Sequence, residues 1–426
     1  MELAVHSEIG RLREVLVHTP GREVENMPPS MMAELLFDDI LHAPAARDEH
    51  RRFCAVLAAL GVGVHDTHDL LREALEHRPE YSARLLDYLV ELEGLGAGIR
   101  AELATLEPAA LADALVHGVP ARPEDIAPDY LFRLPPLPNL LFSRDAQVVI
   151  GNRVIIGAMS RGARRREPLL SRFIFRNHPQ LEGTLILADF LKPRRGQSWQ
   201  RNVTPTLEGG DVLVFEEGVV IVGVSERTME RAADRLADAL RAEGSFERLI
   251  LVPMPHSRSA MHLDTIFTRV SVDECLVYPP MILAGGSETL SVISIDLREA
   301  DDWGRRRPSL LEALGELGVR LEPICCGGPD DYLRQTREQW TDGANSFAVR
   351  PGVILLYSRN TATAAEFARR GYEVVSVDDM PFAPDGSCGY EFAPDRRYAV
   401  LIAGGELSRA RGGPRCMTMP LVRDAV

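Results

Sequence analysis

The sequence predicts a mixed α/β protein, built as a closed, propeller-like ring of α/β units. Three observations lead to this prediction. Hairpin patterns, each with two apolar runs around a polar or glycine turn, recur after residue 138. Helical patterns lie between these hairpins. The residues that precede them are spaced unevenly, by 66, 53 and 82 positions, which argues against a regular solenoid: Asp145, Asp211, Asp264 and Ser346.

The N-terminal segment already alternates strand and helix patterns. A short strand is expected from Arg13 to Val17, ended by Thr19-Pro20-Gly21. The segment after Ala43 predicts a helix, because four apolar residues fall at i, i+3, i+4 and i+7: Phe53, Val56, Leu57 and Leu60. A second strand is expected at Val62-Gly63-Val64. This order is typical of α/β proteins.

The composition changes between residues 69 and 131. This segment is rich in Leu, Ala, Glu and Arg, with apolar residues at helical spacing and no strand pattern. It predicts four or five helices. We interpret residues 69–131 as an all-helical insertion domain within a catalytic α/β domain formed by residues 1–68 and 132–426, since insertions are tolerated where their ends lie close together.

The predicted hairpins carry the rest of the fold. They are expected at Ala146–Ile156, Val212–Val222, Ile266–Tyr278 and Phe347–Tyr357. Helices are expected between them, for example from Ser225 to Leu240 and from Thr361 to Arg370. The N-terminal strand and the C-terminal cysteine segment would form the remaining unit of the ring.

Charge and cysteine content restrict the class of protein. The net charge is −14 and the pI is near 5.4, which argues against nucleic acid and anionic membranes as partners. No signal-peptide pattern and no apolar run of 18 residues is present, so a cytoplasmic protein without membrane spans is expected. The six cysteines form no CxxC pair, so a zinc ribbon is not predicted and the thiols are expected to be reduced.

Cys416 is the first candidate for chemistry. It follows a segment rich in glycine that contains Arg409, Arg411 and Arg415. Cationic neighbours favour the thiolate, the nucleophilic form of cysteine. The alternative is a free cysteine packed near the chain end, and this segment alone does not decide between the two.

Polar residues head the predicted hairpins: Arg144-Asp145, Glu208-Gly209-Gly210-Asp211, His262-Leu263-Asp264 and Asn345. If the units are related by a rotation, these positions face a common axis and meet Cys416 there. His262 and Asp264 are two residues apart, which places both on one side of a strand. Each signal has a structural alternative: a hydrogen-bonded strand histidine, an Arg144–Asp145 ion pair, or a plain turn. Asp211 is expected to fix its loop.

Two kinds of chemistry fit this set. A hard cation could be bound by four of the residues: His262, Asp264, Glu208 and Asp145. The preferred interpretation is chemistry on a guanidinium group, because carboxylates accept paired hydrogen bonds from its planar nitrogens. Two carboxylates would hold the guanidinium carbon in front of Cys416. His262 would protonate the leaving ammonia and then activate water.

These residues carry a resemblance that extends along nearly the whole chain. The sequence resembles the bacterial arginine deiminases of the guanidino-group-modifying, or pentein, superfamily. The resemblance implies a five-fold pseudosymmetric α/β propeller with an all-helical insertion. It rests on Val5-His6-Ser7-Glu8, Leu36-Phe37-Asp38-Asp39, Pro135 to Asn139, Phe142-Ser143-Arg144-Asp145, Ala163-Arg164-Arg165, Leu207 to Asp211, Glu226-Arg227, Met261 to Thr265, Arg337 to Trp340, Arg359-Asn360-Thr361 and Cys416-Met417-Thr418.

The resemblance also implies a role for each site residue. Cys416 would be the nucleophile that forms a thiouronium adduct, and His262 the general acid and base. Asp145 and Asp264 would bind the guanidinium, while Glu208 supports His262 and the attacking water. The remaining roles belong to the amino-acid end of the substrate: Arg164, Arg227 and Asn139 as its ligands, Phe142 packed beside it, and Arg411 as the mobile arginine of a gating loop.

The implied function is hydrolysis of L-arginine to L-citrulline and ammonia without a metal or organic cofactor. Alternatives are a hydrolase or amidinotransferase that acts on another guanidino compound, and an inactive, arginine-sensing relative. Arg164 and Arg227 favour arginine over agmatine, which has no carboxylate. The expected partner is this small molecule, and a homo-oligomer is compatible with the sequence. Two departures from the family pattern are Pro414-Arg415 before the cysteine and an inserted loop from Val377 to Leu401.

Overall fold

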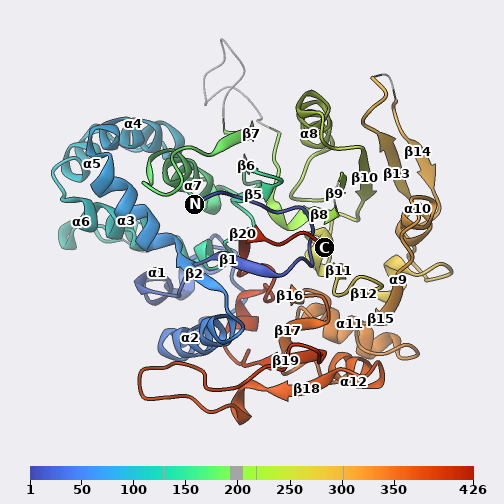
Figure 1. Cartoon of the computed structure of the whole chain (residues 1–426). Helices are drawn as coiled ribbons and strands as arrows, with labels where there is room; N and C mark the ends of the chain where they lie inside the picture. The colour runs from blue at the N-terminus through green and yellow to red at the C-terminus, as the bar shows by residue number, and fades with distance from the viewer. Residues whose placement is uncertain (128–129, 192–204, 217, 301) are drawn as a thin grey trace.

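The computed structural model describes residues 1–127, 130–191, 205–216, 218–300 and 302–426 (Figure 1). The described chain is mixed α/β, as predicted. Its strands form five sheets of three to five strands and one two-stranded sheet. Glu217, in the turn of the second predicted hairpin, lies outside the described residues.

The five larger sheets share one pairing pattern, in which an antiparallel pair is followed by a parallel neighbour of its second strand. In this order the strands are β5 (Gln147–Ile150), β6 (Arg153–Ile156) and β7 (Leu185–Asp189); β8 (Val212–Glu216), β9 (Val219–Val224) and β10 (Arg248–Pro253); β11 (Phe267–Arg269), β12 (Glu274–Val277) and β15 (Glu322–Cys325); β16 (Phe347–Arg350), β17 (Val353–Tyr357) and β19 (Tyr398–Ile402); and β20 (Met419–Arg423), β1 (Leu12–Val17) and β2 (Gly63–Asp66).

The antiparallel pairs confirm all four predicted hairpins. The sheet β20–β1–β2 joins the two ends of the chain, as expected for the remaining unit. Three further strands extend the larger sheets: β13 (Val292–Asp296) beside β10, β14 (Arg305–Arg307) beside β13, and β18 (Glu373–Ser376) beside β19. The hairpins and their parallel strands are connected largely through helices: α1 (Arg22–Glu25), α2 (Ala43–Ala59), α7 (Arg166–Asn177), α8 (Glu230–Glu243), α9 (Pro279–Ile282), α10 (Leu310–Glu316) and α12 (Thr361–Arg369). The helix α11 (Tyr332–Trp340) instead connects β15 to the next hairpin.

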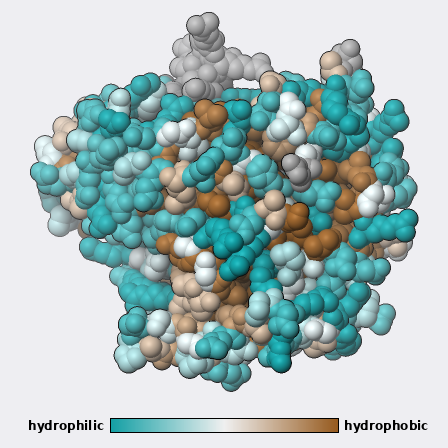
Figure 2. All heavy atoms as spheres, viewed as in Figure 1, coloured by the Kyte–Doolittle hydropathy of each residue, from teal (hydrophilic) through white to brown (hydrophobic). Residues whose placement is uncertain are grey.

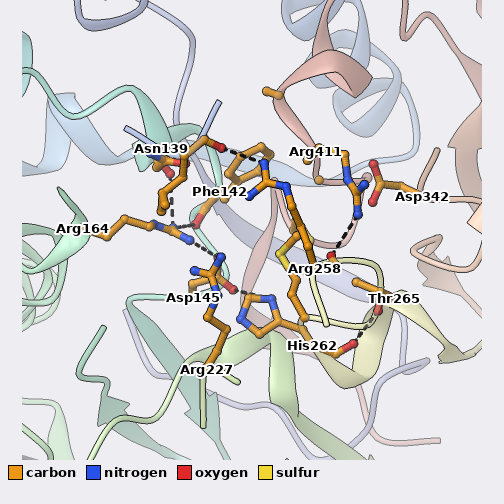
Figure 3. A pocket seen from close by; sticks show the side chains of 15 residues that line it. Asn139, Phe142, Asp145, Arg164, Arg227, Arg258, His262, Thr265, Asp342 and Arg411 are labelled. Carbon is orange, nitrogen blue, oxygen red and sulfur yellow. Dashed lines mark hydrogen bonds and ion pairs between the residues drawn. The ribbon is translucent and has the colours of Figure 1, made fainter. Parts of the chain in front are cut away.

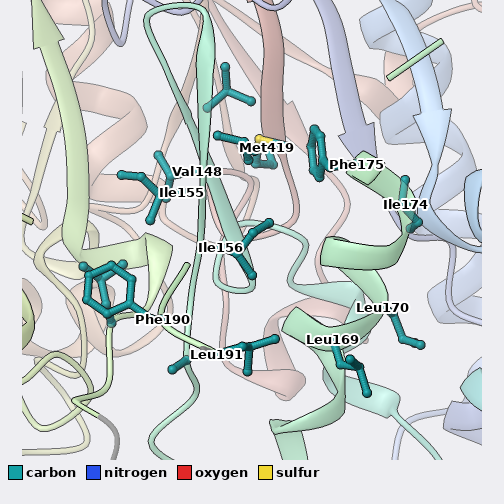
Figure 4. Close-up of a cluster of buried hydrophobic side chains, with 14 of the residues drawn as sticks. Val148, Ile155, Ile156, Leu169, Leu170, Ile174, Phe175, Phe190, Leu191 and Met419 are labelled. Carbon is teal, nitrogen blue, oxygen red and sulfur yellow. The ribbon is translucent and has the colours of Figure 1, made fainter. Parts of the chain in front are cut away.

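The segment after β2 is helical, with four helices: α3 (Thr67–His77), α4 (Ser82–Glu93), α5 (Ala97–Leu103) and α6 (Pro108–His117). They gather at the left of Figure 1, beside α7. Leu86 and Leu115 belong to the same hydrophobic cluster as Leu169 and Leu170 of α7, and Figure 4 shows this cluster reaching Ile156 in β6. The helical segment is therefore fixed to its neighbouring α/β unit by shared burial of apolar surface.

Three sequence predictions need correction. The segment expected to lack strands, residues 69–131, contains the short strand β3 (Val119–Pro120), which pairs antiparallel with β4 (Phe132–Leu134) just beyond it. The helix expected from Ser225 starts only at Glu230, because the Ser225 hydroxyl accepts hydrogen bonds from the N–H groups of Arg227 and Thr228 and forms a turn there. The loop expected to reach Leu401 ends before β19, where hydrogen-bonding to both β17 and β18 fixes the chain in the sheet.

Figure 2 shows the hydropathy of the residues on one face of the molecule. That face carries mainly hydrophilic residues, with apolar ones interspersed. Within the described ranges, no helix combines the length and the apolar character needed to cross a membrane.

Candidate active site

Two of the polar residues that head the hairpins, Asp145 and His262, line one small cavity together with Cys416 (Figure 3). The cavity measures about 20 Å³. Since a single water needs about 10–15 Å³ of such space, the site is closed to anything larger. Its lining consists of Leu36, Asn139, Phe142, Asp145, Arg164, Arg227, Arg258, Met261, His262, Thr265, Asp342, Ala410, Arg411, Gly412 and Cys416.

The fold explains why residues so distant in sequence meet. Asp145 precedes β5, Glu208 precedes β8, His262 precedes β11 and Cys416 precedes β20, so each occupies the same place in its sheet. The close approach requires glycine between them. A Cβ added at Gly210 would lie 2.6 Å from Nδ1 of His262, closer than side-chain atoms pack. The structure thus brings together the residues that the hairpin pattern placed at a common axis.

His262 is held between two buried carboxylates. Its Nε2 lies 2.9 Å from Oε2 of Glu208, and its Nδ1 lies 3.8 Å from Oδ1 of Asp145. Burial disfavours the charged ring, but the negative charges of Asp145 and Glu208 outweigh it and raise the pKa of His262 to about 9. His262 is therefore an imidazolium at neutral pH, able to donate a proton.

Cys416 is buried and positioned by Asn345. Its N–H donates to Oδ1 of Asn345 at 3.1 Å, and Nδ2 of Asn345 donates to the carbonyl of Asp264 at 3.2 Å. The Sγ atom lies 3.8 Å from Oδ2 of Asp264. Burial and the carboxylates of Asp264 and Asp145 raise the pKa of Cys416 well above its usual range. The Cys416 side chain is therefore a thiol at neutral pH.

The expectation that neighbouring arginines favour the thiolate is therefore wrong. Arg415 forms ion pairs with Glu8 and Asp264. Arg409 pairs at the surface with Asp39 and Glu406. The guanidinium groups of both arginines are neutralised by these carboxylates. The prediction failed because proximity to the cysteine in sequence does not determine where an arginine side chain points.

Arg164 lines the cavity, but most of its N–H groups are already used. Nη1 donates to Oδ2 of Asp145 at 2.6 Å. Nε and Nη2 donate to Glu167, and Nη2 also to the carbonyls of Asn139 and Phe142. Only one N–H on Nη1 remains for a ligand. Arg164 thus orients Asp145, and with His262 it holds the pKa of Asp145 below its usual range despite burial.

Arg411 is less satisfied. Its Nη2 donates to the carbonyl of Arg258 at 3.1 Å, and its guanidinium lies 3.5 Å from the centre of the Trp340 ring. Its Nε and Nη1 atoms are buried and have no hydrogen-bond partner within the described ranges. Arg227 donates from Nε to Glu226 and has Nη1 3.7 Å from Oε2 of Glu208. Two cationic groups with spare donors therefore border the cavity.

The remaining predicted residues fall around this centre. Asn139 and Phe142 belong to the lining, and Nδ2 of Asn139 donates to the carbonyl of Leu35 at 2.6 Å. Asp264 and Glu208 do not line the cavity but contact Cys416 and His262. Asp211 accepts from Ser225 and from the N–H of Leu263, so it fixes two loops as expected.

Sequence reasoning assigned no role to several residues of the lining. Leu36 lay in a recognised motif, whereas nothing in the sequence pointed to Arg258 or Asp342. Burial, with the nearby charge of Asp264, raises the pKa of Asp342 to about 7 even though Arg411 opposes this. Among the described non-glycine residues, those with positive φ are Leu36 (68°), Asp342 (62°) and Arg411 (64°), and all three line the cavity. Such strain gathers at functional sites.

Asp145, Glu208 and His262 also have ligand atoms within 4.8 Å of one another, close enough to bind a metal ion. The positive charge that two carboxylates require is, however, supplied by protein groups, because Arg164 binds Asp145 and His262 binds Glu208. The arrangement can instead hold a planar cation against a thiol, beside a proton donor.

This architecture belongs to the fold class of the amidinotransferases. An amidinotransferase of the saxitoxin biosynthetic pathway from Microseira wollei matches with a TM-score of 0.54 and 14% sequence identity, covering 100% of this chain and 98% of that one. At this identity the likeness concerns the fold alone.

Within that class, the chain belongs to the arginine deiminase family. The family model described as arginine deiminase matches residues 33–383 and 390–423. Arginine deiminase of Staphylococcus aureus (strain MRSA252) is 33% identical over 443 residues, which cover 100% of this chain and 99% of the relative. Arginine deiminase of Latilactobacillus sakei is 32% identical over 452 residues, with 99% and 98% covered. The unmatched residues 384–389 lie within the segment predicted to be inserted.

Proposed function

We propose that this protein hydrolyses L-arginine to L-citrulline and ammonia through a covalent adduct on Cys416. The observation that carries the proposal is the convergence of Cys416, His262 and Asp145 on one small cavity, in a chain of the arginine deiminase family. Asp264 contacts Cys416 and Glu208 contacts His262 behind this lining. The six cysteines are unpaired, which supports a cytoplasmic location.

We also infer that the five larger sheets are units of a five-fold pseudosymmetric α/β propeller, the pentein fold. Their common pairing pattern supports this, as does β20, which pairs with β1 across the two ends of the chain. The helices α3–α6 support an all-helical insertion at residues 69–131, within a catalytic domain of residues 1–68 and 132–426.

The guanidinium group would bind between Asp145 and Asp264. Oδ1 of Asp264 is buried without a hydrogen-bond partner in the described part of the chain, and such an acceptor is costly unless a ligand satisfies it. Its Oδ2 is 3.8 Å from Sγ of Cys416, so a guanidinium held by this carboxylate places its carbon next to the sulfur. Glu208 keeps His262 charged and oriented on the other side.

The thiol of Cys416 and the imidazolium of His262 indicate the order of the reaction steps. A bound guanidinium adds positive charge beside Cys416 and lowers the thiol pKa, which burial and carboxylates had raised. The thiol releases its proton to water, and the resulting thiolate attacks the guanidinium carbon; as the S–C bond forms and one C–N bond breaks, His262 donates a proton to the departing ammonia. Neutral His262 then takes a proton from water, and the hydroxide attacks the adduct. The S–C bond breaks as the new hydroxyl gives up its proton, which releases citrulline and returns Cys416 to the thiol.

The amino-acid end of arginine would lie against the cationic rim. Nε and Nη1 of Arg411 lack partners, and an α-carboxylate would satisfy them. Arg227, the remaining N–H of Arg164, and Asn139 would complete the contacts, while Phe142 packs beside the aliphatic chain. This rim favours arginine over a guanidino compound without a carboxylate.

Arginine enters only if the site opens, because the cavity holds no more than about one water. The segments that carry Leu36, Arg258 and Arg411 are joined by two hydrogen bonds: from Nη2 of Arg258 to the carbonyl of Leu36, at 3.2 Å, and from Nη2 of Arg411 to the carbonyl of Arg258, at 3.1 Å. Movement of Arg411 with its loop would break the second bond and give access to Cys416.

The function is tested by incubating the purified protein with L-arginine in the presence of EDTA. Equal amounts of citrulline and ammonia are expected, with agmatine turned over far more slowly. In an Arg411→Ala variant, kcat/KM for arginine should fall by about 10–100-fold, since charge-assisted hydrogen bonds contribute roughly 1.5–3 kcal/mol. The value for agmatine should change much less.

Other outcomes would contradict the proposal. Activity lost on chelation and restored by a divalent cation would indicate metal-dependent hydrolysis at Asp145, Glu208 and His262. Transfer of the amidino group from arginine to added glycine, in place of citrulline formation, would indicate an amidinotransferase. If Arg411→Ala lowered kcat/KM equally for agmatine and arginine, Arg411 would not be a ligand of the substrate carboxylate.

The pH dependence should report His262. Because its pKa is raised to about 9, the imidazolium is present at neutral pH and is lost above that value, so kcat/KM should fall as pH rises through about 9. Glu208→Gln removes one of the charges that raise this pKa and should move the decline to lower pH. Glu182→Gln, at an exposed carboxylate paired with Arg78, should leave the profile unchanged. An unshifted decline in Glu208→Gln would contradict this assignment.

A further inference from the structure

A second group of potential metal ligands lies away from the catalytic cavity, where α3 packs against α6. It consists of His68 in α3 with Asp113 and His117 in α6. One ligand atom from each lies within 4.8 Å of the others. Nε2 of His68 is 3.0 Å from Oδ1 of Asp113, and Nδ1 of His117 is 3.7 Å from the same oxygen.

Local structure accounts for this arrangement. Asp113 and His117 are four residues apart on α6, so they share one face of the helix. His68 is the second residue of α3, and its N–H donates to Oδ1 of Asp66, which caps that helix at 2.9 Å. The separations of 3.0 and 3.7 Å bracket the value of about 3.4 Å between tetrahedral ligands whose bonds to zinc are about 2.0–2.1 Å.

A buried glutamate provides an independent indication of a ligand. Glu23 of α1 is completely buried, and its Oε2 has no hydrogen-bond partner among the residues that the structure describes. This oxygen lies 3.6 Å from Nε2 of His117, the ring nitrogen opposite the one that faces Asp113. Histidines that bind a metal through one nitrogen usually donate the other N–H to a carboxylate, which fixes the ring.

We propose that His68, Asp113 and His117 bind a transition-metal dication of the Zn²⁺ class, with Glu23 orienting His117. Two imidazoles and one carboxylate favour zinc or a similar ion over the hard ions Mg²⁺ and Ca²⁺. The side chains are 24%, 56% and 19% exposed, respectively, so an ion reaches them from solvent and water completes its coordination. The ion links α3 to α6 and, through Glu23, both helices to α1.

The proposal is tested on the full-length protein after chelation and removal of the chelator. Isothermal titration with Zn²⁺ should show one ion bound per chain, and the melting temperature should rise with Zn²⁺ because the ion binds the folded state. Co²⁺ should give absorption bands typical of a four-coordinate site. His68→Ala and His117→Ala, on different helices, should each lose this binding. Glu23→Gln should weaken it by about 10–100-fold.

The controls separate this site from the catalytic one. His65→Ala removes another half-buried histidine, paired with Glu14 in the neighbouring strand, and should bind Zn²⁺ like the unmodified protein. His262→Ala should also retain binding. The proposal is overturned if His68→Ala and His117→Ala, shown by circular dichroism to be folded, bind Zn²⁺ normally. It is equally overturned if binding is lost only in His262→Ala.

Discussion

Replacing Cys416 with serine should lower kcat for arginine by at least about 10⁴-fold, as expected when a catalytic nucleophile is removed. A serine hydroxyl is far harder to ionise than a thiol, and His262 cannot act as its base while it is charged. Citrulline formation measures the loss. In addition, unmodified protein quenched with acid during turnover should show, by intact-protein mass spectrometry, an adduct of arginine minus ammonia. The variant should show none.

Cys388→Ser is the matched control for this substitution. Cys388 is half-buried, with Sγ 3.9 Å from Sδ of Met380, and it does not line the catalytic cavity. The same chemical change there should leave turnover intact. Arginine binding by Cys416→Ser, measured calorimetrically, would show that the variant is folded. Turnover within tenfold of the unmodified enzyme would exclude the covalent route.

The convergence of the site was predictable because it depends on a pattern that repeats along the chain. Polar residues precede the apolar hairpins, and each hairpin forms the antiparallel pair of its own sheet. Asp145 and His262 are 117 positions apart, yet their side chains are 3.8 Å apart because both occupy that position. The predicted helices were confirmed where apolar residues recur at helical spacing, as in α2 and α12.

The charge state of Cys416 was not predictable, because it depends on contacts between distant segments. Arg415 adjoins the cysteine in sequence, but its guanidinium binds Glu8, 407 positions away. The start of α8 was missed for a local reason. The Ser225 turn competes with helix formation and places Arg227 at the cavity. Backbone strain at Leu36 is likewise invisible in the residue type.

Replacing Arg415 with alanine should lower the free energy of unfolding by about 3–5 kcal/mol at neutral pH, since removal of one partner leaves buried charges uncompensated. Arg415 is almost completely buried. Its Nε donates to Glu8 at 3.0 Å, its Nη1 to Asp264 at 2.8 Å, and its Nη2 to the carbonyl of Val212 at 3.0 Å. Chemical denaturation followed by circular dichroism measures the change.

The pH dependence of this loss separates charge from packing. Burial alone would raise the pKa of Glu8, but Arg415 and Arg144 hold it below the usual value. Without Arg415 the pKa of Glu8 in the folded variant should rise above its value in the unfolded chain. Lowering the pH therefore protonates Glu8 in the folded variant first, and the difference in free energy of unfolding between the variant and the unmodified protein becomes smaller. A deficit caused only by lost packing would not depend on pH. Arg409→Ala, at a surface pair with Asp39, should cost far less. Equal losses in the two variants would mean that the buried cluster contributes no more than a surface ion pair.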